Sequence, residues 1–140
     1  MAAKIFLNLA VKDLERSMNF FKSIGYRFEE KATDETAACL VISDDIYVML
    51  LTEKKFLQYT PKQIADTSKT TEVMTCITVE TKDKVNEIVD KAVAAGAAEN
   101  SKTEEFPSMY YRSFCDLDGH IWEIMWMVPE SEQDPGNTAK

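Results

Sequence analysis

Apolar and polar residues alternate along the first part of the chain in the order strand, helix, strand, strand, strand. Strand-like alternation covers residues 4–12, 26–30, 36–43 and 46–52. Asp13 is placed to cap a helix with apolar residues at helical spacing, and Gly25 is placed to end that helix. The pattern therefore predicts a βαβββ module.

The second part of the chain repeats this order. Strand patterns cover residues 72–80, 97–103, 108–115 and 120–127, and the second of them is weak. Between the first two, Thr81 is placed to cap a helix and Gly96 to end it, and the apolar stripe of this helix is Val85, Ile88, Val89, Ala92 and Val93. In the last strand, period-2 alternation places Glu123 and Met125 on one face and Trp122 and Trp126 on the other.

The repeat defines the domain organisation. We expect one domain over residues 1–128, with modules at 4–52 and 72–128. Residues 53–71 are expected to form a polar linker with a short helix at 61–66, and residues 129–140 a loose tail poor in apolar residues.

Composition limits the classes of function. Hydrophobic residues make up 45% of the chain, enough for a packed interior, and the net charge of −8 argues against a nucleic-acid partner. No apolar stretch reaches the roughly 20 residues that cross a bilayer, and the N-terminus lacks the features of a signal peptide. We therefore expect a cytoplasmic protein without a membrane partner. The three widely spaced cysteines predict buried thiols rather than disulfides.

Two segments of the chain resemble motifs of a known superfamily. They are Leu9-Ala10-Val11-Lys12-Asp13-Leu14-Glu15-Arg16-Ser17 with Phe20-Phe21 and Ile24-Gly25-Tyr26, and Phe114-Cys115-Asp116-Leu117-Asp118-Gly119-His120-Ile121-Trp122-Glu123. On two βαβββ modules, these motifs resemble the glyoxalase/bleomycin-resistance/extradiol dioxygenase superfamily, also called vicinal oxygen chelate. The resemblance covers residues 4–128. It implies an α+β fold in which the modules form a curved, barrel-like mixed sheet around a ligand cavity, and a homodimer.

The resemblance also implies where a metal would be held, on the first and last strands of each module. The aligned positions carry Phe6, Met49, Met74 and Glu123. Only Glu123 offers an oxygen ligand, and thioethers favour soft ions such as Cu(I) over Zn, Ni, Fe or Mn. We therefore expect no cofactor and no tightly held metal, with Glu123 the one residue that would contribute to such a site.

Glu123 has two interpretations, because a carboxylate on a buried strand face is costly unless it is paired. It either forms a salt bridge, for example to Arg112, or serves in the cavity as a general base or substrate anchor. The same alternation makes Asn8, Met49, Met74 and Met125 candidate ligand-binding residues, although filling the core is the ordinary role of such methionines. Arg112 is a further ligand-binding candidate, because an Arg–carboxylate pair at a cavity wall could serve both structure and binding.

The turn before the last strand carries the sole histidine, His120. Its structural interpretation is a turn residue that bonds backbone, and its functional one is a ligand or general base. Asp116 and Asp118 are expected to close the turn, with Gly119 supplying a positive φ. Tyr110 and Tyr111 must point to opposite faces, and the pattern leaves open which faces the cavity.

The function we expect is the binding of a small, partly apolar molecule without a tightly held metal. A first alternative is a metal-dependent lyase of the lactoylglutathione lyase type or a dioxygenase, which would need ligands from Glu123, His120 or a partner chain. A second alternative is an interaction or regulatory domain whose cavity is filled by its own side chains.

Overall fold

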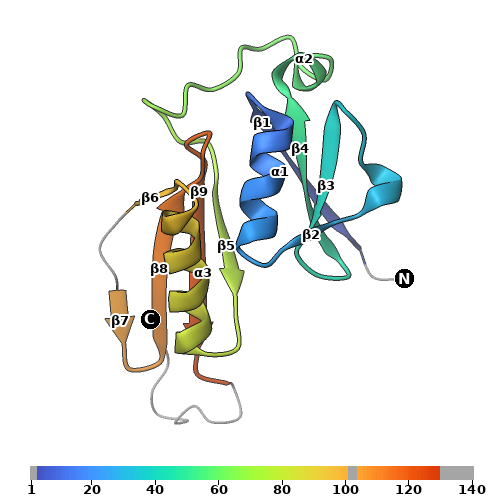
Figure 1. Ribbon diagram of the computed structural model, residues 1–140. Helices are drawn as coiled ribbons and strands as arrows, with labels where there is room; N and C mark the ends of the chain where they lie inside the picture. Colours follow the sequence, from blue (N-terminus) through green and yellow to red (C-terminus); the bar gives the residue numbers. More distant parts are fainter. Residues whose placement is uncertain (1–2, 101–103, 130–140) are drawn as a thin grey trace. The chain divides into compact units, whose positions relative to one another are not determined.

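The computed structural model describes residues 3–100 and 104–129. The chain divides into two compact units, each built around one mixed sheet (Figure 1). Unit 1 comprises residues 1–72 with 117–119, and unit 2 comprises residues 73–116 and 120–140. Both units contain the predicted order strand, helix, strand, strand, strand, with a few short elements added, which confirms the α+β prediction with two βαβββ modules.

Unit 1 has a four-stranded sheet of order β1-β4-β3-β2. Its elements are β1 (Ile5–Val11), α1 (Leu14–Ser23), β2 (Arg27–Phe28), the 3-10 helix η1 (Glu30–Ala32), β3 (Ala37–Val41), β4 (Ile46–Thr52) and α2 (Glu53–Phe56). β1 runs parallel to β4, and the other pairs are antiparallel. The Asp13 carboxylate caps α1 by accepting the Arg16 N–H at 3.1 Å, and Gly25 follows the helix with a φ of 106°. Both predicted helix ends are thus confirmed.

The core of unit 1 lies on one face of this sheet. Helix α1 packs against β3 and β4 (Figure 1). Alternate strand residues such as Leu40, Val48 and Leu50 are fully buried, together with Phe21 of the helix. Removing these side chains from water is the main source of stability for this unit.

Unit 2 repeats the topology with strand order β5-β9-β8-β6, and β7 pairs additionally with β8. Its elements are β5 (Met74–Thr78), α3 (Lys82–Ala94), β6 (Ala98–Glu99), β7 (Glu104–Phe106), β8 (Met109–Cys115) and β9 (Ile121–Met127). Here too the first strand, β5, runs parallel to the last, β9. Thr81 caps α3 by accepting the Lys84 N–H at 3.0 Å, and Gly96 follows with a φ of 112°.

The core of unit 2 lies between α3 and the sheet. The helix packs against β8 and β9 (Figure 1). Trp122 and Ile124 of β9 are buried there with Phe114 of β8, so the predicted facing of the last strand is confirmed. Val93 is 42% exposed, so its assignment to the apolar stripe was wrong.

Several local predictions differ from the structure. Residues 61–66 are not helical; the short helix is α2, directly after β4 and capped by the Thr52 hydroxyl. The strand expected at 97–103 is reduced to β6, residues 101–103 lie outside the described residues, and so does the expected tail beyond 129. All three cysteines are free thiols, but only Cys39 is buried, whereas Cys76 is exposed. Among the described residues, no helix is long and apolar enough to cross a membrane.

Candidate functional site

Met49 and Glu123 occupy equivalent positions in the two sheets. In unit 1, Met49 lies on β4 between Asn8 of β1 and Cys39 of β3. In unit 2, Glu123 lies on β9 between Cys76 of β5 and Ser113 of β8. Paired residues on neighbouring strands project to the same face. The duplication therefore places one row of three side chains across each sheet.

The row in unit 2 is part of a larger surface, which we call the Glu123 face. It is the face of β5, β9 and β8 opposite α3, and the strand register assigns to it Met74, Cys76, Thr78, Ile121, Glu123, Met125, Met127, Met109, Tyr111, Ser113 and Cys115. Met74 is 60% exposed and Met127 is 49% exposed, whereas Ile121, Glu123 and Met125 are half-buried. The Glu123 face is thus an apolar, methionine-rich sheet surface with a carboxylate at its centre.

The Glu123 carboxylate has no salt bridge or hydrogen bond to any of the described residues. Cys76 pairs with Glu123 on the adjacent strand and interacts with it electrostatically. Burial raises the pKa of the Cys76 thiol, and the negative charge of Glu123 raises that pKa further. Cys76 is therefore a protonated thiol near neutral pH, and Glu123 has no ion pair within the part of the chain that the structure describes.

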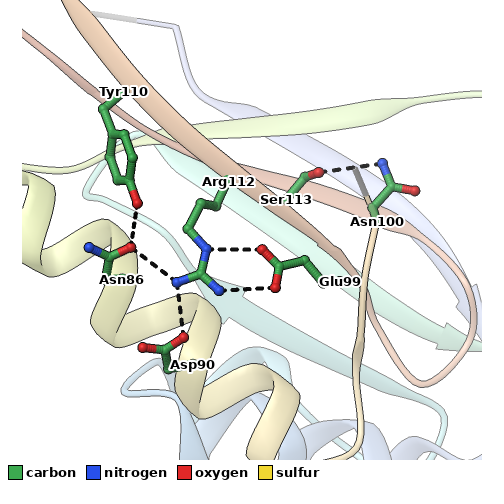
Figure 2. A network of polar contacts seen from close by, with 7 residues as sticks. All are labelled: Asn86, Asp90, Glu99, Asn100, Tyr110, Arg112 and Ser113. Carbon is green, nitrogen blue, oxygen red and sulfur yellow. Dashed lines mark hydrogen bonds and ion pairs between the residues drawn. The ribbon is translucent and has the colours of Figure 1, made fainter. Parts of the chain in front are cut away.

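Arg112, the predicted salt-bridge partner of Glu123, lies on the opposite face of the sheet, so that prediction was wrong. Figure 2 shows its guanidinium surrounded by side chains of α3 and β6. It donates to both carboxylate oxygens of Glu99, at 3.0 and 3.1 Å, to Asp90 at 2.9 Å and to Asn86 at 3.0 Å. Its register partner on β9 is Ile124 rather than Glu123. The Arg112 side chain is only 12% exposed, and its bonds connect β8 with α3 and β6. It lies on the side of the sheet away from the Glu123 face.

The same network settles the orientation of the two tyrosines. The Tyr110 hydroxyl donates to the Asn86 side chain of α3 at 2.6 Å (Figure 2), so Tyr110 belongs to the helix side of the sheet. Tyr111 pairs with Met125 and therefore lies on the Glu123 face. Hydrogen bonding to the Glu99 carboxylate, and to a lesser extent to Asp90, raises the pKa of Arg112 above its ordinary value, so the guanidinium remains charged.

The equivalent face of unit 1 carries the other two candidates. Asn8 is exposed and Met49 is half-buried beside it. Further along β1, Phe6 is 52% exposed and its ring stacks on Tyr47 of β4, with ring centroids 4.8 Å apart. This face therefore combines an amide with apolar and aromatic surface, but it has no counterpart of the Glu123 carboxylate among its register positions on β1, β3 and β4.

The acidic turn before β9 has a structural role in both units. In unit 2, Asp116 is 7% exposed and accepts the Trp122 indole N–H at 2.9 Å and the His120 backbone N–H at 3.0 Å. In unit 1, Asp118 accepts the Lys12 N–H and the Ser17 hydroxyl, both at 2.9 Å. The turn assignment of Asp116 agrees with these bonds, whereas Asp118 bonds the start of α1, which is distant in sequence.

Gly119 completes this turn with a φ of 84°. The Thr67 hydroxyl donates to the Asp118 carbonyl at 2.5 Å, and a Cβ on Gly119 would lie 2.6 Å from the Thr67 hydroxyl oxygen. Both the backbone conformation and the space therefore require glycine.

The metal that the resemblance implies does not fit the residues present. The aligned side chains are Phe6, Met49, Met74 and Glu123, of which one alone is an oxygen donor. Within the described part of the chain, no group of three or more His, Cys, Asp or Glu side chains is placed to hold a metal ion.

Sequence reasoning missed Cys76, Ser113 and Tyr111 as residues of the Glu123 face. Their positions follow from strand pairing, which period-2 alternation within one strand does not reveal. The duplication does contain the information: counted from residues 4 and 72, where the predicted first strands begin, Cys76 and Asn8 occupy the same position, and Asn8 was selected.

Comparison with known proteins gives information on the fold and on family likeness. Residues 5–43 match the family model for the N-terminal part of bleomycin resistance protein-like proteins. No curated protein is similar enough in sequence to be matched. A hypothetical protein from S. aureus, SA1046, is 26% identical with a TM-score of 0.76, and the alignment covers 90% of this chain and 94% of that one.

Two further solved structures share the fold at lower identity. A glyoxalase/bleomycin resistance protein/dioxygenase family enzyme from Burkholderia phytofirmans is 16% identical with a TM-score of 0.74, covering 91% of this chain and 100% of that one. The fosfomycin resistance protein FosX from Mesorhizobium loti is 12% identical with a TM-score of 0.65, covering 94% and 97%. Residues 5–43 therefore match a bleomycin resistance protein-like family model, and the solved structures show that this chain shares their fold.

Proposed function

We propose that this protein binds a small, partly apolar molecule on the Glu123 face and does so without a tightly held metal. The observation that carries the proposal is the half-buried Glu123 carboxylate in an apolar sheet surface, with no ion pair to a described residue. A carboxylate in such surroundings lowers the stability of the fold, because it has lost part of its hydration. A ligand group that forms a hydrogen bond with the carboxylate would offset this loss.

The side chains around Glu123 suit an apolar ligand. Met74 and Met125 flank it on the neighbouring register positions, and Tyr111 lies beside Met125. Methionine is flexible and polarisable, so it adapts to ligands of different shape, and an aromatic ring adds rigid contact area. Most small-molecule sites combine such apolar surface with few polar groups. Asn8 and Met49 offer a related but uncharged surface in unit 1.

Methionine methyl NMR tests the proposal directly, because the chain has seven methionines. We would label their ε-methyl groups, assign the signals by Met→Leu substitution, and screen a library of small aromatic and aliphatic compounds. Compounds that bind are expected to shift the signals of Met74 and Met125, while Met18 of helix α1 serves as the internal control. A screen in which no compound shifts either signal contradicts the proposal.

We also propose that the protein is a homodimer, as its superfamily resemblance implies. β1 is an edge strand of its sheet, and Ile5 at its start is 60% exposed. Exposed apolar edge strands favour association with another chain. Light scattering coupled to size-exclusion chromatography is expected to give twice the chain mass of 15.9 kDa. A monomer at all accessible concentrations would contradict this.

A further inference from the structure

We propose that the ligand of the Glu123 face is a lipophilic cation, that is, an apolar body carrying a protonated amine that pairs with Glu123. This inference rests on the proposed function and names the chemical class of its ligand. It follows from the distribution of charge on unit 2.

The first step is the sign of the charge on the Glu123 face. The positions that β5, β8 and β9 contribute to this face include no lysine or arginine, and Glu123 is the one carboxylate among them. Arg112, the cation of β8, is on the other face and bonded to Glu99 and Asp90. An anionic ligand would therefore meet an unneutralised negative charge, and a neutral ligand would cover the carboxylate without compensating it.

The second step is the strength of the pairing. An ammonium group that donates to a half-buried carboxylate forms a charge-assisted hydrogen bond, which is stronger than a bond between neutral groups. Such bonds contribute enough to change affinity by roughly tenfold or more. The formal net charge of −8 adds a long-range attraction for cations that salt weakens.

The third step concerns the apolar part of the ligand. Around Glu123 lie the thioethers of Met74 and Met125, the Ile121 side chain and the Tyr111 ring. Polarisable sulfur and an aromatic ring both favour the methylene groups next to an ammonium, and the ring can also interact with the cation itself. A compact, strongly hydrated inorganic cation would gain nothing from this surface.

Three probes with the same body and different charge test the inference: 4-phenylbutylamine, 4-phenylbutanol and 4-phenylbutyrate. At neutral pH the amine is a cation, the alcohol is neutral and the acid is an anion. Affinities are measured at low salt from the methyl shifts of Met74 and Met125. We expect the amine to bind roughly tenfold more tightly than the alcohol, and the acid to bind most weakly.

Two variants connect this preference to one side chain. Glu123→Gln keeps the shape of the side chain and removes its charge, and Glu35→Gln removes one charge from an exposed bend of unit 1. Thermal melts and circular dichroism verify that both are folded. Glu123→Gln is expected to abolish the advantage of the amine over the alcohol, whereas Glu35→Gln retains it.

The outcomes separate the two proposals. If the alcohol binds as tightly as the amine, or if both variants lose the preference equally, the cation inference is wrong while the proposed binding function stands. If none of the three probes shifts the Met74 or Met125 signal up to its solubility limit, the cation inference is overturned. The broader library screen then decides separately whether the binding function also fails.

Discussion

The Asp118 carboxylate provides the sharpest test of how unit 1 is held together. It accepts hydrogen bonds from the Lys12 N–H and the Ser17 hydroxyl, both at 2.9 Å, and its side chain is 5% exposed. Arg16 lies 3.6 Å away, but its side chain is 47% exposed and such a pair contributes little. These two hydrogen bonds therefore contribute more to stability than the ion pair with Arg16.

Replacing Asp118 with alanine would leave these two donors in different situations. Lys12 is exposed, so water can replace the lost partner of its N–H group. Ser17 is 2% exposed, so its hydroxyl would lose its acceptor in a buried position, at a cost of about 1–3 kcal/mol. With the loss of the second charge-assisted bond, we expect Asp118→Ala to lower the free energy of unfolding by about 2–4 kcal/mol. That corresponds to a fall in Tm of roughly 6–12 °C for a domain of this size.

Urea and thermal melts of Asp118→Ala, Ser17→Ala and the double variant measure this effect. A coupling energy of about 1 kcal/mol or more between the two sites is expected, because each single variant already breaks their hydrogen bond. Asp45→Ala, in the exposed acidic turn of the first module, is the matched control and should change stability by less than about 0.5 kcal/mol. Additive single variants, or a loss for Asp118→Ala no larger than that of the control, would refute the reasoning.

Four further predictions concern unit 2 and its Glu123 face. Trp122→Ala should lower the free energy of unfolding by about 3–5 kcal/mol in urea melts, because Trp122 is 1% exposed; a loss under about 1 kcal/mol would contradict its burial. Glu123→Gln should speed iodoacetamide alkylation of Cys76 near pH 8, measured by mass spectrometry, because removing the negative charge lowers the thiol pKa and increases the thiolate fraction; an unchanged rate counts against their proximity. Glu123→Met should raise Tm in thermal melts, since it removes a half-buried charge and copies the residue at the equivalent position, Met49; a lower Tm would indicate a structural role. Elemental analysis after mild purification should find no stoichiometric Zn, Ni, Fe or Mn, and one ion per chain that is lost in Glu123→Gln would disprove this.

Periodicity predicted the elements that have a long, regular pattern. β9 was predicted with its facing because Trp122 and Ile124 alternate with Glu123 and Met125 over a full strand. Helix α3 was predicted with both ends because Thr81 and Gly96 have local preferences that need no distant partner. Local chemistry is sufficient in such cases.

The errors concern elements that depend on distant or weak interactions. β7 has three residues and forms by pairing with β8, which no local pattern of Glu104–Phe106 indicates. The linker helix was expected near residues 61–66. Instead, the Asp66 carboxylate ends this segment in a turn by accepting hydrogen bonds from the backbone N–H and the hydroxyl of Ser68. α2 forms earlier, where the Thr52 hydroxyl caps four residues.

The site was predicted in part, and the reason lies in strand register. Glu123 was identified because a carboxylate stands out in an apolar strand. Its proposed partner Arg112 was wrong because β8 pairs Ser113, not Arg112, with Glu123. A difference of one residue in register moves a side chain to the other face of a sheet, and sequence patterns within a single strand do not fix register between strands.

The duplication gives the strongest argument for the binding role that we propose for Glu123. The two sheets have the same strand order, and Met49 in one occupies the position of Glu123 in the other. Met49 shows that this position of the architecture is compatible with an apolar side chain. A half-buried carboxylate without an ion pair among the described residues costs free energy relative to methionine. Because the fold does not require a carboxylate here, the simplest explanation for its free-energy cost is an interaction between Glu123 and a bound molecule. A cationic ligand on the Glu123 face would provide that interaction.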